Sequence, residues 1–291
     1  MRVERVYDWR RGEGLIERDP QPLDLAVRRP ATTRVGHLSD THLGKENRHH
    51  RRRELRRWLE TLEGLGVDLI VHSGDVVDSP DDEEAVDDAR TMLGGQDVPC
   101  LVVPGNHDVR RPGEKSVIAK RWGPYPRAET VGELRISLLD SMAHPPVDQR
   151  SEKEQQLAEE SGFFTSGALG PKQIEAWDEQ LDEPWTGAQL LVVHHHPRQP
   201  VPEKPWYEQN ADLMAPLRDA DEMLSVARRR GIEMVLHGHR HQYVPPYAPF
   251  DDLVIVNGGS VTRTPWPKRL RIIDVADQGG EARIWELVRF S

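Results

Sequence analysis

A series of short apolar runs, most of them followed at once by polar and chemically reactive residues, constrains this chain more than any other feature. The runs have the length of buried strands, and stretches of helical pattern separate them. Strand and helix therefore alternate, which predicts an α/β core. The runs occupy residues 34–38, 69–72, 101–103, 134–139, 190–193 and 234–236.

Four helices are expected between these strands. The first is predicted by apolar residues at positions i, i+3, i+4 and i+7, which form one buried helix face; they are Leu55, Trp58, Leu59 and Leu62. Ser79 and Pro80 predict the start of a second helix. Apolar positions within 174–181 and 223–227 indicate the third and fourth.

The end of the chain has a different pattern. Three more apolar runs, at 254–256, 270–275 and 282–288, have no helices between them. Strands that follow one another without a crossover helix pair most simply as antiparallel neighbours. We therefore expect these three strands to be largely antiparallel.

Length and composition favour one folded domain. A chain of 291 residues can bury a full core. Residues 1–33 are polar and look irregular, apart from an edge strand at 23–27. We expect an N-terminal extension packed on a single domain that spans residues 34–291. The N-terminal arginines are interleaved with acidic residues, unlike a signal or transit peptide, so the cytoplasm is the default location.

Charge and cysteine content narrow the partners. The formal net charge of −10 argues against a nucleic-acid partner, because non-specific binding to a phosphate backbone depends on clustered lysine and arginine. The single cysteine, Cys100, excludes an internal disulfide framework and reads as a small buried strand residue. No membrane partner is expected, and the sequence does not indicate an oligomeric state.

The residues at the strand ends carry the functional signal, because ligands of open α/β sheets bind beyond the carboxyl ends of strands. Five of the six runs deliver aspartate, histidine or asparagine there, and the fourth delivers nothing obvious. The five segments are Ser39-Asp40-Thr41-His42, Gly74-Asp75, Gly105-Asn106-His107-Asp108, His194-His195-His196-Pro197 and Gly238-His239-Arg240-His241.

These segments predict a metal site. Residues two positions apart in an extended segment point to the same side, so Asp40 and His42 can bind one ion, and His239 and His241 repeat the spacing. The candidate ligands supply nitrogen and oxygen but no sulfur, which suits Mn, Fe or Zn. With one bridging carboxylate they suit two divalent cations roughly 3.5–4 Å apart. The set is Asp40, His42, Asp75, Asn106, His195, His239 and His241.

Taken in order, the motifs resemble those of the calcineurin-like metallophosphoesterase superfamily. They are D-x-H, G-D-x-x-D, G-N-H-D, H-H-P and G-H-x-H, and the resemblance spans about residues 34 to 260. It implies a four-layer αββα sandwich, with two mixed β-sheets flanked by helices. It also implies that Asp75 bridges the two ions, with Asp40, His42 and His241 on one ion and Asn106, His195 and His239 on the other.

Residues beside the expected ligands are assigned supporting roles. His107 is expected to protonate the leaving oxygen or to stabilise phosphoryl charge, with its ring oriented by Asp108. Asp78 is expected to hold a ligand in place through a hydrogen bond, or only to cap a turn. The other histidines near the ligands are expected to pack or support more than to coordinate; they are His37, His194, His196 and His237.

Contacts to substrate are expected from residues on the loops around this centre. Arg110, Arg111, Arg198 and Arg240 are placed to meet a phosphate, and Trp206 and Tyr207 lie in a proline-rich loop that could stack on a ring or anchor to the surface. The basic run at 49–57 is more typical of a solvated helix face than of a phosphate-binding patch.

The sequence therefore predicts a dinuclear phosphoesterase that hydrolyses a small phosphodiester, such as a cyclic nucleotide, by attack of a hydroxide bridging the two ions. Within the superfamily, the H-H-P motif and the segment from Gly162 to Leu181 most resemble bacterial cyclic-nucleotide-phosphodiesterase-like members. Three alternatives stay open: a DNA exonuclease of the repair type, a phosphomonoesterase, and a metal-binding scaffold without turnover.

Overall fold

The structure is a computed structural model. It describes residues 2–20, 25, 30–109, 114–143, 166–198, 217–241, 244–262 and 268–289. Its strands form two sheets that pack face to face, and both are mixed.

The first sheet has seven strands in the order β2-β1-β13-β12-β3-β4-β5. Its parallel part consists of β3 (Thr32–Leu38), β4 (Leu69–His72) and β5 (Cys100–Val102). The antiparallel part consists of β12 (Lys268–Ala276), β13 (Glu281–Arg289), β1 (Arg2–Arg10) and β2 (Gly14–Arg18). The carboxyl ends of β3, β4 and β5 therefore lie together.

The second sheet has six strands in the order β10-β11-β9-β8-β7-β6. Four of them are parallel: β7 (Leu134–Leu138), β8 (Ala188–Val192), β9 (Met234–His237) and β11 (Leu253–Asn257). Antiparallel strands close both edges, namely β6 (Arg127–Val131) and β10 (Tyr247–Phe250).

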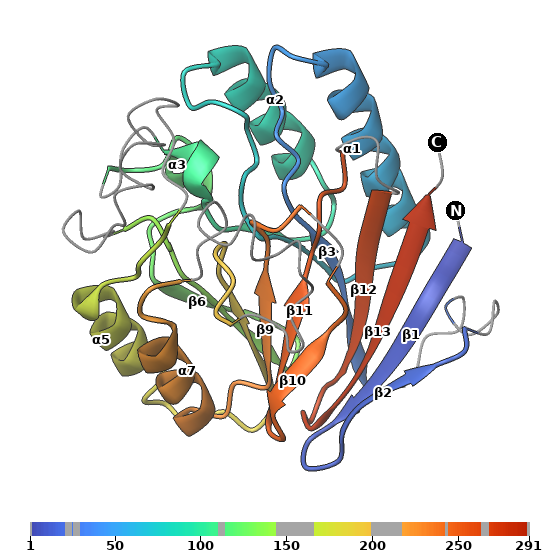
Figure 1. The fold of residues 1–291 in the computed structure, drawn as a ribbon, viewed down its shortest axis with the longest axis vertical. Coiled ribbons are helices and arrows are strands. Elements are labelled where there is room, and N and C mark those ends of the chain that lie inside the picture. Colours follow the sequence, from blue (N-terminus) through green and yellow to red (C-terminus); the bar gives the residue numbers. More distant parts are fainter. Residues whose placement is uncertain are drawn as a thin grey trace, which may run out of the picture.

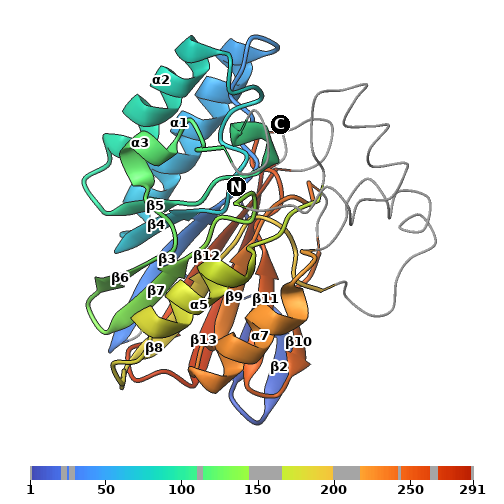
Figure 2. The ribbon, with the colours of Figure 1, turned by 90° about the vertical axis from the view of Figure 1, so that its left-hand side faces the viewer.

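Helices cover the outer face of each sheet, so the layers follow one another as helix, sheet, sheet, helix (Figures 1 and 2). A hydrophobic core that includes Val71, Leu190 and Ile273 lies between the sheets. The first sheet is covered by α1 (Arg48–Gly64) and α2 (Glu83–Gly94), and the second by α5 (Pro171–Gln180) and α7 (Ala220–Arg229). Two short elements, η1 (Asn106–Asp108) and α3 (Ala119–Trp122), complete the described part. The predicted αββα sandwich is confirmed.

All six predicted strands of the alternating region are present within one or two residues of their expected bounds. The apolar stripe of α1 is buried as expected. The second helix, α2, begins at Glu83, later than the start that Ser79 and Pro80 indicated. Asp82 is its cap, because the Asp82 side chain accepts a hydrogen bond from the backbone nitrogen of Ala85 at 3.2 Å. Among the described helices, none is long and apolar enough to cross a bilayer.

One expectation about the chain ends is wrong, and another holds only in part. The first residues are not irregular, because β1 pairs with β13 and β2 pairs with β1. The strand at 254–256 is not antiparallel to its inner neighbour, because β11 runs parallel to β9, while β12 and β13 are antiparallel as expected. The expected edge strand at 23–27 lies outside the described residues except for Leu25.

Candidate metal centre

The loops that follow the parallel strands of both sheets meet at one place. Backbone hydrogen bonds join the loops after β3 and β4. The amide of Asp40 donates to the carbonyl of Gly74, and the amide of His42 donates to the carbonyl of Asp75, each at a distance of 3.0 Å. In the second sheet, the amide of Gly238 donates to the carbonyl of His194 at 3.0 Å. The side chains of these loops are therefore held by backbone contacts.

Four of the expected ligands have left-handed backbone conformations, with φ of 52° at Asp40, 45° at His42, 52° at Asp75 and 66° at His239. Such a conformation costs of order 1–3 kcal/mol for a residue other than glycine and is concentrated at functional sites. The two aspartates and two histidines thus turn sharply off their strands. This differs from the extended geometry that we expected to align Asp40 with His42.

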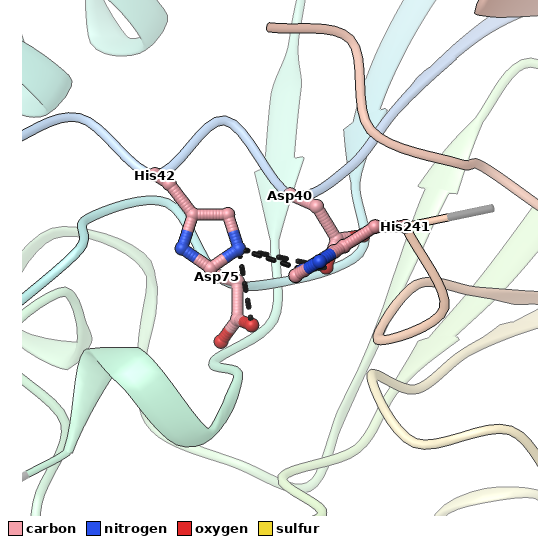
Figure 3. A group of neighbouring side chains, drawn as sticks. All are labelled: Asp40, His42, Asp75 and His241. Atoms are coloured by element: carbon pink, nitrogen blue, oxygen red, sulfur yellow. Dashed lines mark hydrogen bonds and ion pairs between the residues drawn. The ribbon is translucent and has the colours of Figure 1, made fainter. Parts of the chain in front are cut away.

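The first group of side chains contains Asp40, His42, Asp75 and His241, which point toward one another (Figure 3). The Nε2 atoms of His42 and His241 are 2.9 Å apart. The Nε2 atom of His42 is 3.6 Å from Oδ2 of Asp75, and the Nε2 atom of His241 is 3.3 Å from Oδ1 of Asp40. Two imidazoles and two carboxylates from three loops therefore converge on one point.

Asp78 sets the orientation of His42. Its Oδ1 atom is 3.2 Å from Nδ1 of His42, which makes Nδ1–H the donor and leaves the lone pair of Nε2 directed at the group. The Arg51 guanidinium also approaches this carboxylate, at 3.4 Å, and donates to the carbonyl of His42. Arg51 belongs to the basic run that we interpreted as a solvated face, and its contact with Asp78 was not predicted.

A second group is formed around the same Oδ2 atom of Asp75. The Nε2 atom of His194 is 3.3 Å from Oδ2 of Asp75 and 3.2 Å from Oδ1 of Asn106. The Nδ1 atom of His239 is 3.1 Å from the same Asn106 oxygen. Asp75, His194 and His239 have ligand atoms close enough to hold one ion. Asp75 therefore belongs to both groups.

The structure brings His194, rather than the expected His195, to Asp75 and Asn106. His194 lies two residues beyond the end of β8, just as Asp40 follows β3 and His239 follows β9 by two residues. Its Nδ1–H donates to the carbonyl of Ser73 at 2.8 Å, which directs Nε2 into the group. Counting from the strand end was the signal that could have identified it.

His195 is buried beside this group and makes other contacts. Its Nδ1 atom is hydrogen-bonded to Oγ of Ser141 at 2.7 Å, and its ring packs on that of His239 with 4.4 Å between centroids. Ser141 follows β7, the one strand end at which we expected nothing obvious. That strand end therefore does contribute a side chain to the surroundings of the centre.

Burial and mutual contact set the charges of the cluster. Burial lowers the pKa of His42 to about 4, although Asp78 and Asp75 act in the opposite direction. Burial acts to raise the pKa of Asp75, but His194 and His107 lower it well below its usual range. Burial acts to lower the pKa of His194, yet Asp75 and Asp40 raise it to about 9. The two buried carboxylates thus draw positive charge to this point.

The donor set fits a pair of cations. The Oδ1 atom of Asp40 is buried and accepts no hydrogen bond from the described residues, although it faces His241. Buried carboxylate oxygens are normally satisfied, and a metal ion is one way to satisfy them. The atoms that converge are carboxylate and amide oxygens and imidazole nitrogens, the ligands preferred by Mn, Fe and Zn.

His107 lies next to the first group, but its ring is hydrogen-bonded to a different residue than expected. Its ring packs edge-on against His42 with 4.6 Å between centroids, and its Nδ1–H donates to the carbonyl of Asp78 at 3.0 Å. Its backbone amide donates to Oδ1 of Asp75 at 2.9 Å. Asp108 instead accepts backbone amide hydrogens from Val76, Val77 and Gly105. The prediction that Asp108 orients the His107 ring is therefore not what the contacts show.

The expected substrate contacts are only partly described. Arg240 is buried, with Nη2 at 3.0 Å from Nε2 of His196. Arg198 is exposed, pairs with Asp221 at 3.2 Å and lies over the ring of Phe250. Arg110, Arg111, Trp206 and Tyr207 lie outside the described residues.

Comparison with known proteins agrees with this geometry. Residues 33–243 match the family described as Calcineurin-like phosphoesterase. The DNA double-strand break repair protein Mre11 of Methanosarcina acetivorans is 25% identical over 268 residues, which cover 85% of this chain but only 38% of that protein. The 3',5'-cyclic adenosine monophosphate phosphodiesterase CpdA of Escherichia coli is 25% identical over 230 residues, covering 76% of this chain and 74% of that protein.

Two solved structures share the fold. A dimetal phosphatase from Danio rerio superposes with a TM-score of 0.57 at 15% identity, covering 88% of this chain and 98% of the other. A purple acid phosphatase from yellow lupin gives a TM-score of 0.58 at 13% identity, covering 91% of this chain and 52% of the other. The fold and the site together define a metallophosphoesterase. The chain belongs to the calcineurin-like phosphoesterase family.

The different positions of His194 and His195 predict different effects on metal content. His194→Ala removes an imidazole that faces Asp75 and Asn106, so we expect metal-loaded protein to lose one of its two ions. His195→Ala leaves those contacts in place, and we expect it to keep both. Elemental analysis after metal loading and desalting measures the stoichiometry. Loss of an ion from His195→Ala, with two retained by His194→Ala, is the contrary result.

Proposed function

We propose that this protein is a dinuclear metal-dependent phosphoesterase that hydrolyses a small phosphodiester. One observation carries the proposal: Oδ2 of Asp75 lies 3.6 Å from Nε2 of His42 and 3.3 Å from Nε2 of His194, so a single carboxylate serves both groups. A carboxylate shared in this way suits two ions at the roughly 3.5–4 Å spacing of two-metal hydrolases.

The residues divide between two ion positions. We assign Asp40, His42 and His241 to the first position, Asn106, His194 and His239 to the second, and Asp75 to both. The nitrogen and oxygen ligands favour Mn, Fe or Zn. When bound, the ions supply an activated water and neutralise charge on the phosphate.

The remaining side chains orient and move protons. Asp78 holds the His42 ring, and its carbonyl holds the ring of His107 through Nδ1. This leaves Nε2 of His107 as the nitrogen that can give a proton to the leaving oxygen. Asp108 positions the loops, since its carboxylate joins the backbone of Gly105 to that of Val76 and Val77.

Charge and similarity support a compact diester. Two divalent cations would outweigh the charges of Asp40 and Asp75, so the loaded centre is positive in a protein whose formal net charge is −10. Small anions are drawn to such a centre, while long polyanions are repelled by its surroundings. The similarity to CpdA, which is named a cyclic-nucleotide phosphodiesterase, agrees with this substrate class.

A nuclease is the second candidate, because Mre11 matches over 85% of the chain. The N-terminal half of α1 adds a local observation: it is rich in arginine and contacts the centre through Arg51. A DNA strand could follow this helix despite the overall negative charge.

His107→Ala tests the catalytic assignment. We expect kcat to fall by roughly 10²–10⁴, the usual contribution of one positioned proton-transfer group, with metal content unchanged. The loss is expected to shrink for esters with good leaving groups, because these need no protonation. Steady-state kinetics with a series of aryl and alkyl phosphodiesters measures the dependence.

His49→Ala is the matched control, since His49 is an exposed histidine on α1. It is expected to retain wild-type rates. Equal losses for activated and poor leaving groups in His107→Ala would show that His107 does not protonate the leaving oxygen.

A substrate comparison tests the proposed function itself. We expect metal-loaded protein to show a higher kcat/KM for a cyclic nucleotide or an aryl phosphodiester than for the matched monoester, and only weak action on single-stranded DNA. All three are measured at one salt and metal concentration. Preference for the monoester contradicts the diester assignment, and efficient cleavage of DNA that rises as salt is lowered favours the nuclease.

A further inference from the structure

Asp40 and three buried polar side chains behind it form a continuous hydrogen-bonded chain. The Oγ–H of Ser39 donates to Oδ2 of Asp40 at 2.5 Å, and the Oγ–H of Ser73 donates to Oγ of Ser39 at 2.9 Å. The Nε2 atom of His37 lies 2.9 Å from Oγ of Ser73. All four residues are fully buried. The chain leads from the candidate metal centre into the space between the sheets.

The carboxylate of Asp40, at one end, fixes the direction in which hydrogen bonds are donated along the whole chain. An ionised carboxylate only accepts hydrogen bonds, so Ser39 must donate to Asp40. The Ser39 oxygen then accepts from Ser73, and the Ser73 oxygen must accept from His37. His37 is therefore the Nε2–H tautomer. Its Nδ1 atom has no hydrogen-bond partner among the described residues, which agrees because a buried N–H without an acceptor is rarer than an unused acceptor.

Two glycines of the second sheet make room for this chain. A Cβ atom on Gly238 would lie 2.0 Å from Oγ of Ser39 and 2.7 Å from Oδ2 of Asp40. A Cβ atom on Gly258 would lie 2.7 Å from Cβ of Ser39 and 3.0 Å from Nε2 of His37. Because any side chain at either glycine would displace a member of the chain, the loops of both sheets are adapted to it.

We propose that His37 is a positioning residue of the first ion, acting on Asp40 through Ser73 and Ser39. The chain holds Oδ2 of Asp40 and so turns Oδ1 toward Nε2 of His241, 3.3 Å away, where these two residues would hold the first ion. His37 touches neither substrate nor ion, and its effect is confined to the position that Asp40 serves. This inference rests on the proposed metal centre.

Single-site backgrounds separate the two ions. His194→Ala retains the first position and His241→Ala retains the second, so each background reports one affinity. In the His194→Ala background we expect Ser39→Ala to weaken Mn²⁺ binding by roughly 10–100-fold, the usual effect of removing a partner of a metal ligand. In the His241→Ala background it is expected to change nothing. Calorimetric titration with Mn²⁺ and the electron paramagnetic resonance of the bound ion provide the readouts.

His37 is tested with a pair of substitutions in the same backgrounds. His37→Leu removes the donor to Ser73 and is expected to weaken the first ion selectively. His37→Gln is expected to restore most of the affinity, because its amide N–H can donate to the Ser73 oxygen. Ser137→Ala is the control: it removes a buried hydroxyl of β7 that has no hydrogen-bond partner among the described residues.

The possible results distinguish the inference from the function on which it rests. Equal weakening of both ions by His37→Leu, in step with lower stability of the metal-free protein, contradicts the positioning role. First-ion affinity that is unchanged in His37→Leu and Ser39→Ala contradicts it as well. Wild-type protein that binds no pair of ions overturns the proposed function, and the inference with it.

The tautomer of His37 gives a test that needs no metal. Nitrogen-15 chemical shifts of the imidazole distinguish Nε2–H from Nδ1–H, and we expect Nε2–H. The Nδ1–H form contradicts the chain, because the Nε2 atom would then have to accept from Ser73 and leave Ser39 without its donor.

Discussion

The burial of two carboxylates at one point is the constraint on which the rest of this structure depends. Asp40 and Asp75 are almost completely removed from water, and an uncompensated buried charge is strongly unfavourable. Their described partners are imidazole nitrogens, serine Oγ and backbone amides, not lysine or arginine side chains. Such an arrangement is stable only if positive charge is supplied at the centre. A bound divalent cation would supply that charge.

The fold holds this charge by bringing strand ends from two sheets together. The first sheet contributes Asp40, Asp75 and Asn106, and the second contributes His194 and His239. The left-handed backbone at four of the expected ligands is locally unfavourable, and the packing of the surrounding sheets must offset this strain. The same packing encloses the serine and histidine chain behind Asp40, so hydrogen-bonded polar side chains fill the side of the centre away from solvent.

Much of this could be predicted from the sequence, because buried parallel strands and their polar ends are local signals. The strands at 69–72 and 134–139 and the approach of Asp78 to His42 are examples. Strand β1 could not be recognised from the sequence, because Asp8 and other charged residues interrupt its apolar pattern. Asp8 pairs with Arg18 and with Arg283, each at 2.5 Å, and Arg283 lies close to the opposite end of the chain.

Two contacts within the site were not foreseen from the sequence. Three consecutive histidines offer three candidates, and only the strand end and the carbonyl of Ser73 decide that His194 faces Asp75. In the same way, the sequence places Asp108 beside His107, but the backbone amides of Val76 and Val77 claim its carboxylate. In both cases, contacts between loops of different strands fix where the side chain lies.

The measurement that tests the central claim most directly is anomalous X-ray diffraction from crystals of the protein loaded with Mn²⁺. We expect two anomalous peaks roughly 3.5–4 Å apart. One should lie among Asp40, His42 and His241, the other among Asn106, His194 and His239, and both should contact Asp75. A single peak at full loading, or a pair of peaks that Asp75 does not join, would contradict the account.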